Sequence, residues 1–159
     1  MATVAVGLMS GTSGDGVDAA LLDTDGENKI GFLGGLTLPY DDDLRWRLLE
    51  VSQHDVPLME VLRVEKEVSE HHVEAVRQLL AQHAKLAKKV EIIGFHGHTV
   101  RHSASDGITM QIGNPWILSR DLALPVVSDF RRCDVAGGGQ GGWASMKKSS
   151  PATPAPAAA

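Results

Sequence analysis

The order of hydrophobic patterns along the chain constrains its fold more than any other feature. Three strand-like apolar runs come first, over residues 2–10, 17–25 and 29–39. Helical spacing follows over residues 41–52 and in a longer segment that begins after Pro57, and strand-like residues return at 90–100. Strands that are followed by alternating helices and strands are typical of a mixed sheet with helices packed against it. The sequence therefore predicts an α/β domain that opens with a β-meander.

The helices carry recognisable start signals. Apolar residues recur three or four positions apart over residues 58–87, and Asp55 with Pro57 marks the start of this long helix. A second helix is expected to begin with Asn114 as its N-cap and Pro115 at its first position. This helix is expected to extend over residues 114–122. The other expected elements are a strand over residues 108–113, a strand over 124–130 and a polar, glycine-rich loop over 131–142.

Charge and composition argue against several classes of protein. The 159 residues include 20 acidic and 15 basic side chains, and the net charge of -5 is the opposite of a nucleic-acid-binding surface. No apolar run is long enough to span a bilayer, and the N-terminus lacks a secretory signal pattern. The single cysteine, Cys133, excludes an internal disulfide. We expect a cytoplasmic protein that binds neither nucleic acid nor membrane.

The loop between the first two strand-like runs has the sequence MSGTSGDG. It is not a Walker P-loop, because no Gly-Lys-Ser/Thr follows. Backbone amides in a tight glycine turn can surround an anion, Thr12 and Ser13 add hydroxyls, and Asp15 or Asp18 can hold a hydrated magnesium ion. The same glycines also suit a wide turn with solvated acids. The residues alone leave both interpretations open.

Four segments of the chain resemble the N-terminal half of the anhydro-N-acetylmuramic acid kinase family. In chain order they are GLMSGTSGDGVDAALLD, GFHGHTVRH, TMQIGNP and PVVSDFRRCDVAGGGQG. The resemblance covers residues 4–141. It implies the N-terminal domain of the two-domain fold shared by sugar kinases, Hsp70 and actin, with ATP and a sugar bound in the cleft between the domains.

The resemblance also implies an activity and its site. Members of this family use ATP and water to convert 1,6-anhydro-N-acetylmuramic acid into N-acetylmuramic acid 6-phosphate during cell-wall recycling. ATP and Mg are the implied cofactors, with Asp15 as the metal ligand. The implied residues at the ATP phosphates are Gly11, Thr12, Ser13, Asp15, Gly16 and Asp18. The implied sugar-binding residues are His96, Gly97, Thr99, Arg131 and Arg132. An arginine suits an anionic lactate or phosphoryl group, because its planar guanidinium can bind two oxygens.

The chain departs from the family pattern at several points. The family usually has glutamine where this chain has His98, a small residue where it has Phe95, and leucine where it has Gly14. The family's catalytic carboxylate lies downstream of the GGQG segment, so we expect no catalytic residue in this chain and no kinase activity from it alone.

The last residues differ in composition from the rest of the chain. Residues 142–159 are rich in proline and small residues and have no apolar periodicity, which predicts a disordered tail. Residues 1–141 are then a partial kinase domain whose second domain is missing. A truncation or frameshift after about Gly141 is the simplest explanation of the abrupt change.

Two other functions stay open at this stage. His96 and His98 stand at alternate positions of a strand, with His102 beyond them, which suggests a metal-dependent hydrolase if further ligands complete the set. A non-catalytic nucleotide-binding or interaction fragment is the other alternative. The expected partners are an amino sugar and ATP, and uncovered apolar surface leaves a homo-oligomer open.

Overall fold

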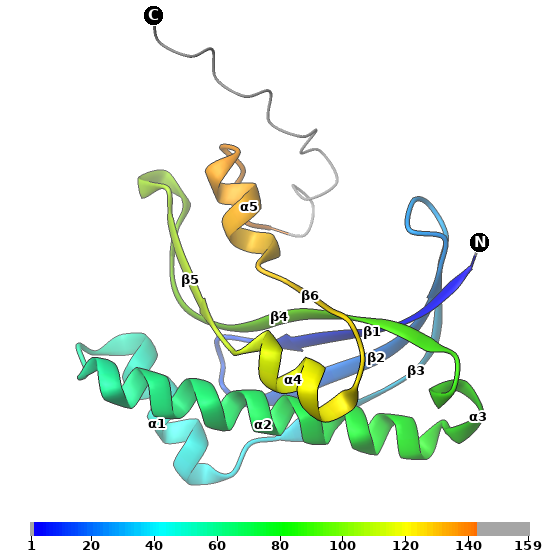
Figure 1. Ribbon diagram of the computed structural model, residues 1–159. Coiled ribbons are helices and arrows are strands. Elements are labelled where there is room, and N and C mark those ends of the chain that lie inside the picture. Colours follow the sequence, from blue (N-terminus) through cyan, green and yellow to red (C-terminus); the bar gives the residue numbers. More distant parts are fainter. Residues whose placement is uncertain (1, 143–159) are drawn as a thin grey trace, which may run out of the picture.

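The computed structural model describes residues 2–142. The tail predicted over residues 142–159 lies, apart from its first residue, outside this range. In chain order the elements are β1 (Thr3–Ser10), β2 (Gly16–Thr24), β3 (Ile30–Pro39), α1 (Asp42–Gln53), α2 (Leu58–Gln82), α3 (Ala84–Ala87), β4 (Val90–Ser103), a 3-10 turn (Ala104–Asp106), β5 (Ile108–Ile112), α4 (Pro115–Leu122), β6 (Val126–Ser128) and α5 (Phe130–Ala136) (Figure 1).

The strands form one mixed sheet, as the sequence predicts. Its order is β3-β2-β1-β4-β5, and β6 also pairs with β4. The first three strands are an antiparallel meander, whereas β4 runs parallel to β1. Strand β4 is long enough to pair with β6 near its start and with β5 near its end. The end of β1 and the second half of β4 therefore lie side by side.

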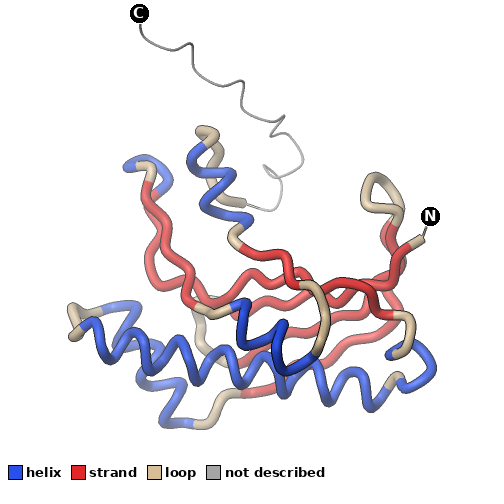
Figure 2. Tube along the Cα trace, viewed as in Figure 1, coloured by secondary structure: helices blue, strands red, loops and turns tan. Residues whose placement is uncertain are grey.

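Helices cover the two faces of the sheet unequally. Helices α1, α2 and α4 lie on one face, while α5 lies on the other side (Figure 1; the same arrangement is coloured by element type in Figure 2). Residues of β1 and β2 alternate accordingly: Val6, Leu8, Val17, Ala19 and Leu21 are buried in the core beneath the helices. Their neighbours along each strand face the side that α5 only partly covers.

Helices α1 and α4 both begin with a side-chain N-cap, which the sequence predicts for Asn114, whereas Asp41 is predicted only to start the helical spacing. The Asp41 carboxylate accepts the Leu44 N–H at 2.8 Å, and the Asn114 side chain accepts the Trp116 N–H at 3.0 Å. The long helix α2 begins directly after Pro57 and has no side-chain cap hydrogen bond, so Asp55 does not cap it.

The expected strand over residues 124–130 is wrong in its second half. Strand β6 ends at Ser128, and Asp129 adopts a left-handed conformation with φ 66° that turns the chain into α5. The segment expected to be a glycine-rich loop is therefore helical up to Ala136, because its glycines begin only at Gly137.

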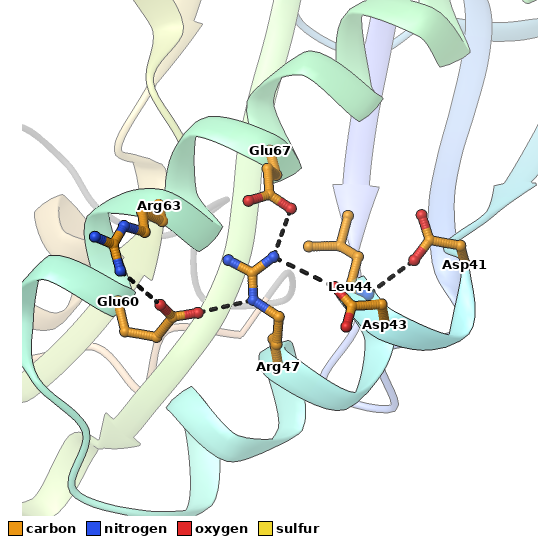
Figure 3. A network of polar contacts seen from close by, with 7 residues as sticks. All are labelled: Asp41, Asp43, Leu44, Arg47, Glu60, Arg63 and Glu67. Carbon is orange, nitrogen blue, oxygen red and sulfur yellow. Dashed lines mark hydrogen bonds and ion pairs between the residues drawn. The ribbon is translucent and has the colours of Figure 1, made fainter.

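Arg47 joins the first two helices through three carboxylates (Figure 3). Its Nε atom lies 2.7 Å from Glu60, and its Nη1 atom lies 2.7 Å from Glu67 and 3.5 Å from Asp43. These hydrogen bonds raise the pKa of the guanidinium above its already high value. The arginine side chain is only 18 % exposed, so this network is better shielded than an ordinary surface ion pair.

We expect Arg47→Met to lower the free energy of unfolding by about 1–2 kcal/mol, because two carboxylates lose a hydrogen-bonded cation. Urea denaturation followed by circular dichroism measures the change. Arg63→Met is the control: that arginine is 65 % exposed and forms an ion pair with Glu60 at 3.6 Å, so its loss is expected to cost no more than about 0.5 kcal/mol. Equal effects of the two variants would contradict the proposed role of Arg47.

Candidate functional site

The loop predicted at the ATP phosphates joins β1 to β2 and contains a tight turn. The Gly14 N–H donates to the Gly11 carbonyl at 3.1 Å, and Gly14 adopts φ 65°, which glycine reaches without strain. Thr12 and Ser13 are exposed at the tip of this turn. The structure therefore has backbone amides and two hydroxyls on a compact turn at the end of β1.

The two acids near this loop already have partners in the chain. Asp15 lies 3.1 Å from Arg45 of α1, and both side chains are substantially exposed. Asp18, the third residue of β2, accepts a hydrogen bond from the Thr37 hydroxyl of β3 at 2.6 Å. Gly16 begins β2 between them and is buried. Both carboxylates stay at the surface, where a hydrated cation has access to them.

A β-bulge in β4 separates the two histidines of the second motif. Leu8 pairs with Phe95 and Ser10 pairs with His98, so two residues of β1 correspond to three of β4. Gly97 absorbs the extra residue with φ 74°. His98 thereby points to the core side, where its Nδ1 lies 2.9 Å from the Ser10 hydroxyl.

The expectation that His96 and His98 share one face of a strand is therefore wrong. His96 lines the opposite, less covered face of the sheet. Within residues 2–142, no group of three or more His, Cys, Asp and Glu side chains is arranged to hold a metal ion. The arrangement behind the metal-hydrolase alternative is absent from this part of the chain.

An open cavity of about 740 Å³ lies on the less covered face of the sheet. Small residues of three strands, Gly7, Gly35 and Gly94, form part of its lining, and Phe130 of α5 also lines it. Its polar lining residues are Asp18, Thr37 and His96. The His96 pKa is lowered by burial, an effect that a hydrogen bond with the Gly97 carbonyl opposes, so the imidazole is neutral at neutral pH. The cavity brings together one residue from each of the two predicted binding motifs.

Arg131 of α5 is held against the end of β4. Its Nη1 donates to the Thr99 hydroxyl at 2.8 Å, and its Nε donates to the Gly141 carbonyl at 2.9 Å. Partial burial lowers the pKa of this guanidinium without removing its charge at neutral pH. Arg132, by contrast, is exposed and lies 3.5 Å from Asp129. Of the two predicted arginines, Arg131 forms a hydrogen bond with Thr99, whereas Arg132 forms an ion pair with Asp129 instead.

Hydrogen bonds from two elements, α5 and β4, hold the glycine-rich segment that follows α5. The buried Asp134 carboxylate accepts the Gly141 N–H at 2.7 Å, and His102 of β4 lies 3.0 Å from the Gln140 carbonyl. Together with Arg131, these contacts fold the segment back over the end of β4.

The structure brings the predicted site residues together only in part. Asp18 and His96 share the cavity, Thr99 and Arg131 share a hydrogen bond, and Gly97 forms the bulge between those two groups. Gly11, Thr12, Ser13 and Asp15 lie outside the cavity lining, in the loop beside it. Sequence reasoning missed Tyr40, Thr37 and Phe130, which lie near the site through contacts between distant segments that no local pattern signals.

No helix within residues 2–142 is long and apolar enough to cross a membrane. The mixed sheet with helices on its faces and the glycine- and hydroxyl-rich β1–β2 loop form an α/β domain, the architecture expected from the resemblance to the class of sugar kinases and actin.

Comparison with known proteins narrows this class to one family. The family model for anhydro-N-acetylmuramic acid kinase matches residues 3–146. The chain is 46% identical over 138 residues to a protein of Paramagnetospirillum magneticum named anhydro-N-acetylmuramic acid kinase, with 87% of this chain and 38% of the relative covered. A protein of the same name from Rhizorhabdus wittichii is 43% identical over 144 residues, which cover 87% of this chain and 40% of that relative. The chain belongs to the anhydro-N-acetylmuramic acid kinase family, and it spans about 40% of the length of these relatives.

Proposed function

We propose that residues 1–141 form the phosphate-binding part, and some of the sugar-binding part, of an anhydro-N-acetylmuramic acid kinase. The reaction is ATP-dependent phosphorylation coupled to hydrolytic opening of 1,6-anhydro-N-acetylmuramic acid, which yields N-acetylmuramic acid 6-phosphate for cell-wall recycling in the cytoplasm. Family membership supports this proposal, and the structural observation that carries it is the cavity shared by Asp18 and His96 beside the β1–β2 loop.

The β1–β2 loop suits the phosphates of ATP. The hydrogen bond from the Gly14 N–H to the Gly11 carbonyl closes a tight turn, and the exposed Thr12 and Ser13 hydroxyls can donate to phosphate oxygens. Asp15 and Asp18 are surface carboxylates, which fits magnesium, because this ion keeps several waters and takes one or two carboxylates in such sites. When bound, magnesium would neutralise phosphate charge.

The sugar side would use His96, Gly97, Thr99 and the arginines of α5. In neutral His96 the Nδ1–H donates to the Gly97 carbonyl, so Nε2 is the ring atom that could accept a hydrogen bond from a sugar hydroxyl. Within the described residues, hydrogen bonds from Arg131 use its Nε and Nη1 atoms, so a contact with a lactate carboxylate would rely on its remaining amino group. The exposed Arg132 would contribute attraction at longer range.

A calorimetric titration with ATP and Mg tests the loop assignment. We expect the 159-residue chain to bind the nucleotide, and Thr12→Val combined with Ser13→Ala to weaken binding about tenfold or more, because hydrogen bonds to charged oxygens are lost. The control is Thr24→Val, since this threonine lies at the opposite end of the β1–β2 hairpin. Unaltered affinity in the double variant would remove the loop from the proposed site.

Turnover separates a kinase domain from a binding fragment. We expect no phosphorylated sugar from the chain alone, because the family's catalytic carboxylate lies beyond the matched segments. A chimera that continues from residue 141 into the remaining part of the Paramagnetospirillum magneticum relative is expected to form the 6-phosphosugar. A folded chimera that binds ATP without turnover would favour the non-catalytic alternative, and product formation by the chain alone would disprove the assignment of the base to the other part.

A further inference from the structure

Tyr40, the only tyrosine of the chain, contacts both ends of the β1–β2 loop. It lies between β3 and α1 and is 7 % exposed. Its phenol hydroxyl donates to the Ser10 hydroxyl at 2.9 Å, and its backbone N–H donates to the Asp15 carbonyl at 3.1 Å. Ser10 is the last residue of β1 and Asp15 is the last residue before β2. One buried residue therefore holds the loop where it begins and where it ends.

Ser10 also contacts a residue of β4. Its hydroxyl oxygen lies 2.9 Å from Nδ1 of His98. Because Tyr40 donates to Ser10, the proton of the serine is available to His98, whose Nδ1 then acts as the acceptor. This arrangement requires a neutral imidazole, and burial lowers the pKa of His98 to about 4. The three side chains form one buried hydrogen-bond chain from the segment between β3 and α1 through β1 to β4.

We propose that Tyr40 and His98 are positioning residues that hold the β1–β2 loop in place relative to the strand carrying His96 and Thr99. This inference gains its functional meaning from the proposed nucleotide site. The loop itself supplies the contacts to phosphate, and Tyr40 acts on them only through Ser10 and Asp15. Preorganised contacts matter because a flexible loop must lose conformational freedom when a ligand binds.

Other contacts of the loop are weaker constraints. The ion pair between Asp15 and Arg45 joins side chains that are 66% and 48% exposed, and pairs of this kind contribute little in water. The hydrogen bonds of Tyr40 and His98 lie in the interior, where water does not compete with them. The buried chain thus adds a side-chain connection between the loop and β4 to the backbone pairing of Ser10 with His98.

Amide hydrogen exchange measured by NMR in the absence of ligand tests the connection. The amides of Gly14 and Tyr40 are the reporters, since both donate within or beside the loop. We expect Tyr40→Phe, which keeps the ring, to accelerate exchange of both amides roughly fivefold to tenfold, as the loss of one buried hydrogen bond implies. Ser10→Ala is expected to have the same effect.

Ser69→Ala is the matched control. This serine is also fully buried, but its hydroxyl donates to the Glu65 carbonyl and accepts the Asn114 N–H, where α2 packs against α4, and neither partner belongs to the loop. Its loss is expected to lower stability without selective acceleration at Gly14 and Tyr40. Equal acceleration in the control and in Tyr40→Phe would overturn the proposal, because the effect would then be general destabilisation.

Two substitutions of His98 add a rescue test. His98→Gln supplies a carbonyl oxygen that can accept a hydrogen bond from the Ser10 hydroxyl. The amide exchange rates of Gly14 and Tyr40 are therefore expected to stay near those of the unaltered chain. His98→Leu fills similar space without an acceptor and is expected to behave like Tyr40→Phe. If both variants leave the exchange of Gly14 and Tyr40 unchanged, His98 has no positioning role and the proposal fails.

A titration of the same variants with Mg and ATP separates this inference from the proposed function. Weaker binding in Tyr40→Phe and His98→Leu, with normal binding in His98→Gln, supports both. Faster loop exchange in a chain that binds no nucleotide supports the connection but refutes the nucleotide site. Normal loop exchange in Tyr40→Phe refutes the connection whatever the nucleotide affinity.

Discussion

Phe95→Ala is expected to lower the free energy of unfolding by about 3–5 kcal/mol, because the removed ring leaves a cavity in the core. Phe95 lies in β4 and is 1 % exposed. Its ring meets that of His72 in α2 edge-on, with centroids 4.9 Å apart and an interplanar angle of 77°. Such contacts add to the stability that the buried area provides. The expected loss is a large part of the stability of an ordinary domain.

Urea denaturation followed by circular dichroism measures this effect. Phe32→Ala is the matched control, since this phenylalanine of β3 is 71 % exposed and its removal should cost no more than about 0.5 kcal/mol. If Phe95→Ala does not fold, Phe95→Leu keeps the experiment informative, with an expected loss of about 1 kcal/mol. Equal stabilities of the Phe95 and Phe32 variants would show that β4 does not pack on α2 through this ring.

The position of Phe95 links the core to the candidate site. The next residue, His96, points to the opposite face and lines the cavity. Packing of Phe95 against α2 thus fixes the strand that presents His96, and a loosened core is expected to disturb the cavity lining as well. Stability and site geometry are coupled here by simple strand alternation.

The order and type of most elements could be predicted because alternation and helical spacing are local properties of the sequence. The bulge at Gly97 could not, because it depends on how β4 pairs with β1, more than 80 residues earlier in the chain. Helix α5 was missed because its seven residues are too few to display a periodic apolar pattern. Its position depends on the left-handed turn at Asp129 and on the contacts of Arg131 with Thr99 and Gly141.

The same distinction applies to the candidate site. The β1–β2 loop could be predicted because its glycines, hydroxyls and acids are contiguous. The role of Tyr40 could not, because its contact with Ser10 spans 30 residues and that of Ser10 with His98 spans 88. Likewise, only the pairing of β2 with β3 brings Thr37 to Asp18.

Acidification is expected to destabilise the chain strongly between about pH 6.5 and about pH 4, because two buried histidines must stay neutral. Burial lowers the pKa of His72 and of His98 to about 4. His72 Nδ1 lies 2.7 Å from the Val68 carbonyl, whereas Nε2 of each ring is buried without a hydrogen-bond partner in the described part of the chain. In His72, where Nδ1 donates to Val68, a second proton would sit on Nε2 and have no acceptor among the described residues, whereas in His98 it would sit on Nδ1 and displace the hydrogen bond from Ser10. His71 and His96 add repulsion when charged.

The sign follows from proton binding in the two states. In the unfolded chain each histidine takes up a proton as the pH falls below about 6.5, whereas in the folded chain it does so only near pH 4. The unfolded state binds more protons within this window, so stability is greatest above it and falls as the pH is lowered. A shift of this size corresponds to about 3 kcal/mol for each histidine. The pKa of Glu60, lowered by its hydrogen bond with Arg47, affects stability only below about pH 4.5.

Thermal or urea unfolding at several pH values between about 7 and about 4 measures the dependence. His98→Gln removes one of the two histidines with the largest pKa shifts and is expected to reduce the slope of stability against pH in this window, while His72 and His96 retain their contributions. His54→Gln is the control for replacing a histidine by glutamine, because its side chain is 61% exposed and lies outside the core. Two outcomes would contradict this prediction: a stability that is flat down to about pH 4.5, or a slope that His98→Gln leaves intact. Either would mean that the interior accommodates the charged imidazole. A charged His98 could no longer accept the hydrogen bond from Ser10 that holds the β1–β2 loop.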